Sequence, residues 1–367
     1  MLRQRAITLA AGAAGGAAFA FAGLPLPWIL GAAFAVMLMN GLAPGKASWP
    51  RWFGDAGIVV VAYVLGQRMT LETVRTMAHD LPGMIAAASL WIAVCIVIGF
   101  GFARLARISK MDGVLGCMPG GLSQMIMLAD EMKGGDPGTV AIMQTSRLVV
   151  VLYTVPMLAA VFADGGGTTT PAAAAAQAVA AAPWPAAAGW AVLPLVPLSA
   201  WLGRRFKLPA GEFLGPVLLV GTLSAVGASL PAVPSPLLAL AQLLIGVYIG
   251  MRVQPRILIA SKRFGPLALG AACLLVALTA AAAAVLASWT GDSVVTWFLA
   301  LAPGGLGEVA LTALLLHADV QQVTAYQLFR LLFILLLAPP LLRYLLDRGR
   351  RSKPAENDTA GHSEASG

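Results

Sequence analysis

The chain alternates long apolar runs with short connections that carry charged residues, Pro or Gly. Most runs extend over about 17–25 residues, the length that a helix needs to cross a hydrocarbon core of roughly 30 Å. We predict spans near 6–22, 27–43, 54–67, 83–103 and 138–162 in the first half, and near 186–202, 213–229, 236–250, 265–288 and 323–345 in the second half. The pattern predicts an all-α polytopic membrane protein.

The second half of the chain repeats the first. The segment from Pro119 to Leu122, Pro-Gly-Gly-Leu, recurs 184 residues later as Pro303 to Leu306. Other matches at this offset are Leu24 with Leu208, Leu30 with Leu214, Pro50 with Pro234, Gly66 with Gly250, Arg68 with Arg252, and Pro82 with Pro266. After a one-residue deletion the offset becomes 183, so that Gln144 and Arg147 match Gln327 and Arg330. We therefore divide the chain into membrane repeat one (1–162), a low-complexity linker (163–185), membrane repeat two (186–347) and a tail (348–367) that we expect to be disordered.

The two Pro-Gly-Gly segments, near 112–131 and 293–316, either cross the membrane or enter it and return. Crossing gives six spans per repeat and parallel repeats, whereas returning gives five spans and inverted repeats. Cytoplasmic connections carry the excess of Lys and Arg. With both termini inside, the five-span arrangement places the basic connections 44–53, 104–112, 203–212 and 251–264 inside, and the linker, 229–236 and 289–293, which lack Lys and Arg, outside. The connection 68–81 also falls outside, where Glu72 and Asp80 offset Arg68 and Arg75. We therefore predict inverted repeats with re-entrant Pro-Gly-Gly segments and a periplasmic linker.

Composition supports the membrane prediction and narrows the function. Hydrophobic residues make up 59% of the chain and charged residues 11%, and the mean hydropathy is +0.83; soluble domains have roughly 45–50% and 25%. The net charge of +8 does not indicate that the protein binds nucleic acid, because the basic residues lie in short connections and at the ends.

The N-terminal apolar run resembles a signal peptide. We expect it to be retained, because residues 6–21 form the first element of repeat one and match 190–205.

The paired Pro-Gly-Gly segments are the strongest candidates for function. Broken backbone at membrane depth persists only where protein or a water-filled cavity solvates it. Two breaks that enter from opposite faces would bring helix N-termini near the midplane, where they attract anionic groups. The alternative is that the glycines only allow helices to pack closely. We predict that Gly120, Gly121, Gly304 and Gly305 bind substrate.

Each last span carries a polar pair, Gln144 with Arg147 and Gln327 with Arg330. Arg147 is about ten residues into its span, roughly 14 Å deep at 1.5 Å per residue. A central Arg costs about 2.5–3.5 kcal/mol on the insertion scale, so these side chains face the interior of the bundle. They either bind an anionic group or tie themselves to backbone carbonyls of the broken segments, and the two roles are compatible.

Glu308 follows the second Pro-Gly-Gly motif and matches Gln124. An intramembrane carboxylate is a candidate for proton or cation coupling, and the alternative is a salt bridge to one of the deep arginines. Ser123 and Gln124 offer neutral hydrogen-bonding groups in the matched half-site. We include all three residues in the predicted substrate site.

No enzymatic site is indicated. The histidines are His79, His317 and His362, and the cysteines are Cys95, Cys117 and Cys273. The two histidines outside the tail lie in different repeats, and an oxidation centre usually needs several converging ligands. Phosphate-binding loops and nucleophile elbows are not found either. We expect no enzyme activity, no metal and no cofactor.

The duplicated Pro-Gly-Gly-Leu with a downstream Gln-x-x-Arg resembles the bacterial AbrB-duplication membrane family over nearly all of residues 6–345. Members of that family are labelled as AbrB-family regulators or as ammonia monooxygenases, so the resemblance implies regulation of gene expression or oxidation as alternatives. It supplies no catalytic residues. From the residues we expect secondary transport of a small anionic solute across the bacterial inner membrane, without direct nucleic-acid contact. The expected partners are the lipid bilayer and the solute, and a homo-oligomer is compatible with the sequence.

Overall fold

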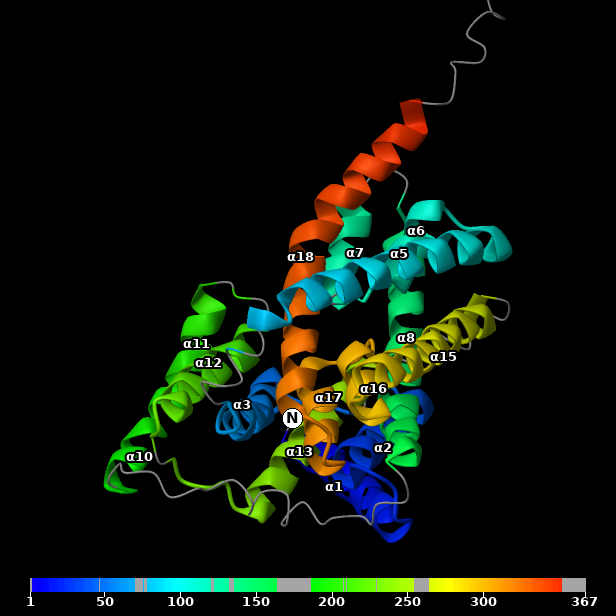
Figure 1. The fold of residues 1–367 in the computed structure, drawn as a ribbon. Helices are drawn as coiled ribbons and strands as arrows, with labels where there is room; N and C mark the ends of the chain where they lie inside the picture. The colour runs from blue at the N-terminus through cyan, green and yellow to red at the C-terminus, as the bar shows by residue number, and fades with distance from the viewer. Residues whose placement is uncertain are drawn as a thin grey trace, which may run out of the picture.

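The computed structural model describes residues 2–163 and 186–351, apart from residues 46, 70–74, 76, 77, 120, 121, 132–134, 207, 209, 229 and 254–263. Most of this part is helical, and it contains no strand (Figure 1). In repeat one the helices are α1 (Leu2–Phe21), α2 (Pro27–Leu42), α3 (Arg51–Gly66), α5 (Leu81–Ala106), α6 (Lys110–Cys117), α7 (Leu122–Glu131) and α8 (Pro137–Phe162). In repeat two they are α10 (Ala186–Val192), α11 (Leu195–Arg205), α12 (Gly211–Ala225), α13 (Ser235–Arg252), α15 (Phe264–Thr290), α16 (Val294–Leu301), α17 (Leu306–Leu315) and α18 (Val320–Arg351).

Four of the described helices, α5, α8, α13 and α15, are long and apolar enough to cross a membrane. Helices α2, α12 and α17 are apolar but shorter. These features support the prediction of a helical membrane protein. The number of crossings in each repeat stays a prediction.

The helix bounds recur at the offset found in the sequence. Helices α2 and α12, α3 and α13, α6 and α16, and α7 and α17 each begin 184 residues apart, and α8 and α18 begin 183 apart. The N-cap residues of α2 and α12 also have the same backbone conformation. Leu26 and Ala210 both have a φ of 49°. The duplicated sequence therefore specifies the same local structure twice.

Two predicted boundaries need correction. The expected span 186–202 is divided into α10 and α11, because Pro194 lacks the N–H that would continue the helix and restricts Leu193. Helix α18 runs to Arg351, so the first residues of the expected tail are helical. The linker from residue 164 and the tail from residue 352 lie outside the described residues.

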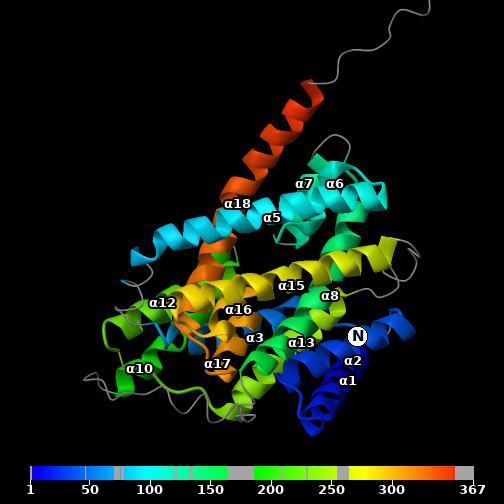
Figure 2. The same ribbon diagram turned by 45° about the vertical axis from the view of Figure 1, so that its right-hand side comes forward.

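The helices pack in two groups that combine both repeats. A six-helix group contains α1–α3 and α11–α13, in which α2 and α3 both pack against α13. An eight-helix group contains α5–α8 and α15–α18, in which α15 crosses α8 and α5 crosses α18 (Figures 1 and 2). Among the described residues, the main helix contact between the groups is that of α17 with α3.

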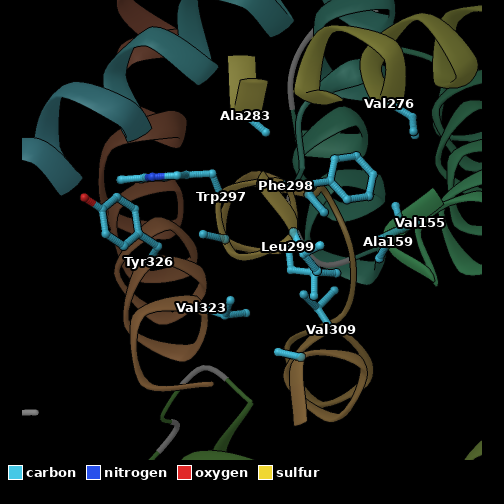
Figure 3. Close-up of a cluster of buried hydrophobic side chains, with 14 of the residues drawn as sticks. Val155, Ala159, Val276, Ala283, Trp297, Phe298, Leu299, Val309, Val323 and Tyr326 are labelled. Carbon is cyan, nitrogen blue, oxygen red and sulfur yellow. The ribbon is translucent and has the colours of Figure 1, made fainter. Parts of the chain in front are cut away.

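Helix α16 packs against α8, α15, α17 and α18, and its side chains form part of a buried apolar cluster (Figure 3). Trp297 points toward Tyr326 of α18, with the two rings 5.1 Å apart and nearly perpendicular. Phe298 points toward α8, where it meets the edge of Phe162 at 5.2 Å. Two faces of this short helix are thus buried against different neighbours, which fixes the position of the Pro-Gly-Gly segment that follows.

Asp136 is the N-cap of α8, and its carboxylate accepts hydrogen bonds from the backbone of Gly138 and Thr139 and from the Thr139 hydroxyl. The bond from the Thr139 side chain holds the pKa of Asp136 below its usual value. The carboxylate form therefore makes the cap, whose contribution is lost as the pH falls through this lowered pKa. We expect Asp136→Ala to reduce stability by about 1 kcal/mol, measured by thermal unfolding in detergent at neutral pH. Asp136→Asn keeps an acceptor and should lose less, and an equal loss in both variants would contradict this role.

Candidate functional site

The second Pro-Gly-Gly motif separates α16 from α17. Helix α16 ends at Leu301, and Ala302 has an extended ψ of 132° because Pro303 follows it. Gly305 is the N-cap of α17 and is also extended. In repeat one α6 ends at Cys117 before Pro119, with Met118 extended in the same way. The sequence prediction of a break is therefore correct at both motifs.

The Gln and Arg pair of α18 holds the end of α16. Gln327 Nε2 donates to the carbonyls of Leu299 and Ala302 at 2.7 and 2.9 Å. Arg330 Nη1 donates to Leu301 and Ala302 at 2.7 and 2.8 Å, and its Nη2 donates to Gln327 Oε1 at 2.6 Å. These carbonyls have no partner within the helix and lie at the negative end of its dipole. Their hydrogen bonds support the structural role considered for this pair.

Repeat one has the same arrangement. Gln144 Nε2 donates to the carbonyls of Leu115 and Met118 at 2.7 and 3.0 Å, and Arg147 Nη1 donates to Met118 at 2.5 Å. In both repeats the Gln and Arg pair therefore holds the end of the helix that precedes the Pro-Gly-Gly motif. Anion binding by these four side chains stays a prediction.

A cavity of about 170 Å³ lies where α17 of the eight-helix group meets the six-helix group. Its apolar walls come from α2, α3, α12, α13 and α17 and comprise Ile29, Ile58, Val61, Ala210, Phe213, Ile245, Ile249 and Leu306. Its polar lining comprises Glu212, Tyr248, Arg252, Glu308 and the backbone of Gly305 and Gly307. Arg252 and Gly305 are exposed, so the cavity reaches the surface.

The guanidinium at this cavity is oriented by an aromatic ring. Arg252 Cζ lies 4.6 Å from the centre of the Tyr248 ring, a cation–π contact. The ring in turn lies against Gly54 of α3, where an added Cβ would be only 2.5 Å from Tyr248 Cγ. The absence of a side chain at residue 54 thus helps to fix a positive charge at the cavity.

Glu308 occupies the third position of α17, beside the N-cap Gly305. Its carboxylate forms no ion pair among the described residues, so the predicted alternative of a salt bridge to a deep arginine is wrong there. Glu308 also lines a second, much smaller space together with Gly304, Thr312 and apolar residues of α2 and α8. Glu308 therefore lines both the larger cavity and this smaller space.

The structure divides the predicted substrate residues. Gly305 and Glu308 line the cavity, and Gly304 lines the smaller space. Gln144, Arg147, Gln327 and Arg330 lie at the capped helix ends instead. Gly120 and Gly121 lie outside the described residues, and Ser123 and Gln124 belong to α7 with side chains outside them.

Sequence reasoning missed Glu212, Tyr248 and Arg252. Glu212 and Arg252 fall in connections that we assigned to the cytoplasmic surface, and Tyr248 falls inside an apolar span. The match of Arg252 with Arg68 was the available signal. By contrast, Glu212 and Glu308 match Trp28 and Gln124, so the carboxylates belong to repeat two alone.

Comparisons with known proteins place the chain in a family. Its residues 28–346 match the family model described as transition state regulatory protein AbrB. The chain is 26% identical over 374 residues to uncharacterized protein YhjN of Bacillus subtilis (strain 168), with 97% of this chain and 96% of that protein covered. It is 27% identical over 324 residues to a protein named as regulator AbrB of Escherichia coli (strain K12), with 88% and 90% covered. Because the family model spans most of its length, this chain belongs to the AbrB family.

Proposed function

We propose that the protein is a secondary transporter of a small anionic solute in the bacterial inner membrane, and not an enzyme. The observation that carries this proposal is the cavity between the two helix groups. It is lined by Arg252 and by the first residues of α17, the helix that follows the second Pro-Gly-Gly break. Broken helices at a central site are a recurring feature of secondary transporters.

The packing of the molecule suits alternating access. A transporter must expose one site to each side in turn, which is achieved when one rigid body moves against another. The six-helix and eight-helix groups each pack internally, and α3 with α17 is the main helix contact between them. The cavity lies at this junction, so relative movement of the groups would open or close it.

The cavity offers two positive features to an anion. The first turn of α17 presents backbone N–H groups that have no partner within the helix, and its dipole favours negative charge. Arg252 adds a guanidinium held on Tyr248. An anionic group between α17 and Arg252 would therefore bind at the junction of the groups.

Inverted repeats form part of this proposal. The matched helix bounds support the duplication, and the distribution of Lys and Arg supports opposite orientations. We expect reporter fusions at residue 170 to give a periplasmic signal and fusions at residues 208 and 258 to give cytoplasmic signals, with both termini cytoplasmic. A cytoplasmic signal at 170 or a periplasmic one at 208 would contradict the inverted arrangement.

The second candidate is a membrane-embedded regulator with an indirect effect on gene expression. The name of the Escherichia coli relative favours it. A solute-binding cavity is compatible with a sensor as well as with a transporter, so uptake into proteoliposomes distinguishes the two. A monooxygenase ranks third, and metal analysis of the purified protein tests it.

The first experiment is a screen of small anions for thermal stabilisation of the purified protein, because a bound ligand raises stability by mass action. We expect Arg252→Gln to weaken binding of the stabilising anion at least tenfold, about 1.4 kcal/mol, without lowering the melting temperature of the free protein. Arg104→Gln, an exposed arginine at the end of α5, is the matched control and should bind like the wild type. Unchanged binding in the Arg252 variant would exclude this cavity as the site.

A further inference from the structure

The walls of the cavity match one kind of solute. Most of the lining is apolar, including Ile245 and Ile249 of α13 and Phe213 of α12. The positive features, Arg252 and the α17 N-terminus, stand among these apolar groups. This arrangement is complementary to a small carboxylate that carries an apolar body, since the carboxylate meets positive groups and the body meets apolar side chains.

The charges of the cavity create a difficulty for such a solute. Glu212 and Glu308 are both carboxylates, and Arg252 is the only basic side chain among the lining residues described. With both acids ionised, an entering carboxylate would meet a cavity that is already negative. Uptake of one proton by the cavity removes this repulsion, so the solute and a proton should bind together.

The position of Glu308 identifies it as the group that takes the proton. The lining that faces it from α2, α3 and α8 is apolar, namely Leu26, Ile29, Leu30, Ile58, Val61, Val151, Leu152, Val155 and Pro156. Among the described residues that line the two spaces, the charged or titratable groups are Glu212 of α12 and Tyr248 and Arg252 of α13. Thr312 of its own helix donates to its backbone carbonyl at 2.7 Å. Glu212, in contrast, lines the larger cavity and not the smaller space.

The internal repeat supplies an independent argument. The residue that matches Glu308 is Gln124, a neutral side chain of the same length. A protonated Glu308 has the shape and the charge of Gln, and thus makes the two halves equivalent at this position. Arg252 and its match Arg68 are charged in both halves. The positive feature is therefore shared, and the titratable one belongs to a single half.

We propose that Glu308 is the proton-binding residue of the transporter, and that its solute is a small carboxylate with an apolar body bound together with one proton. This inference rests on the proposed transport function and specifies its solute class and its coupling ion. Protonation of Glu308 neutralises the inner wall of the cavity, and the carboxylate then binds between Arg252 and α17.

Calorimetric titration of the full-length protein in detergent tests the proposal, with acetate, butyrate and hexanoate as probes and butylamine and butyramide as controls. We expect butyrate and hexanoate to bind more tightly than acetate, and more tightly as the pH falls, by up to tenfold per pH unit for one linked proton. A pH-indicator dye in weakly buffered solution should report one proton taken up per carboxylate bound.

Variants locate the proton. Glu308→Gln imitates the protonated state, so it should bind butyrate with an affinity that does not change with pH and without proton uptake. Glu212→Gln should keep the pH dependence and the proton uptake. Loss of the pH dependence in Glu212→Gln and its retention in Glu308→Gln would overturn the assignment of the proton.

The other outcomes are equally decisive. Carboxylates that bind without proton uptake in the wild type would overturn the coupling and leave the proposed transport of anions intact. Butylamine that binds in place of the carboxylates, and more tightly as the pH rises, would show that an ionised Glu308 pairs with a cation and would overturn the solute class. Failure of every anion to bind would contradict the proposed function itself, and this inference with it.

Discussion

Replacing Arg330 by Gln is expected to destabilise the folded protein by about 3 kcal/mol. The change removes the hydrogen bonds to the carbonyls of Leu301 and Ala302 and to Gln327 Oε1. Among the described residues, Arg330 is the side chain that supplies a hydrogen bond to the Leu301 carbonyl and to Gln327 Oε1, whereas the Ala302 carbonyl keeps the bonds from Gln327 Nε2 and from the Gly304 backbone. Each of the two buried acceptors left without a partner costs about 1–3 kcal/mol. Thermal unfolding and expression level measure the effect. Arg330→Lys should not restore stability, because an ammonium lacks the planar fork that reaches both partners.

Arg204→Gln is the matched control. Arg204 pairs with Asp55 at 2.6 Å, but its side chain is 46% exposed. Because exposed ion pairs contribute about 0.2–1 kcal/mol, Arg204→Gln should lower stability by no more than that. Normal stability of Arg330→Gln combined with lost anion binding would assign this arginine to the substrate site instead. Near-normal stability and unimpaired transport in the double variant Arg147→Gln/Arg330→Gln would refute both roles.

Replacing Gly31 by Ala is expected to destabilise the protein by about 2–3 kcal/mol through overpacking. An added Cβ at Gly31 would meet the backbone of Gly15, so α1 and α2 would have to separate. Close approach of this kind is the usual reason for small residues between membrane helices. The matched Gly215 of α12 meets the backbone of Ser199 in α11 in the same way, and Gly215→Ala should have a similar effect.

Gly270→Ala is the control, because an added Cβ there meets no atom within 4 Å. In an open helical position Ala is favoured over Gly by about 0.5–1 kcal/mol, so this variant should unfold at the same or a higher temperature. Thermal unfolding of all three variants in the same detergent makes the comparison. If Gly31→Ala and Gly270→Ala behave alike, the contact between α1 and α2 is looser than the structure indicates.

The sequence by itself determined the helical class, the duplication and the two breaks. These features are local, because Pro119 and Pro303 restrict the residues before them wherever they stand. The same applies to the pairing of Gln327 with Arg330, since residues three apart lie on one face of a helix. The sequence also predicts, as one of two compatible roles, that these side chains bind backbone carbonyls, because a guanidinium inside a membrane protein needs acceptors.

Only the tertiary structure showed that α17, Arg252 and Glu212 meet at one cavity and that the helices form two groups drawn from both repeats. Hydropathy does not distinguish apolar side chains that face lipid from those that face protein, because lipid tails are as apolar as the neighbouring side chains. In α5, Leu90 is 65% exposed and Ile92 is 3% exposed, although the two residue types are similarly apolar. Which helix faces meet is decided by the fit between their surfaces, and that fit brings Glu308 of repeat two to the same cavity as Ile29 of repeat one.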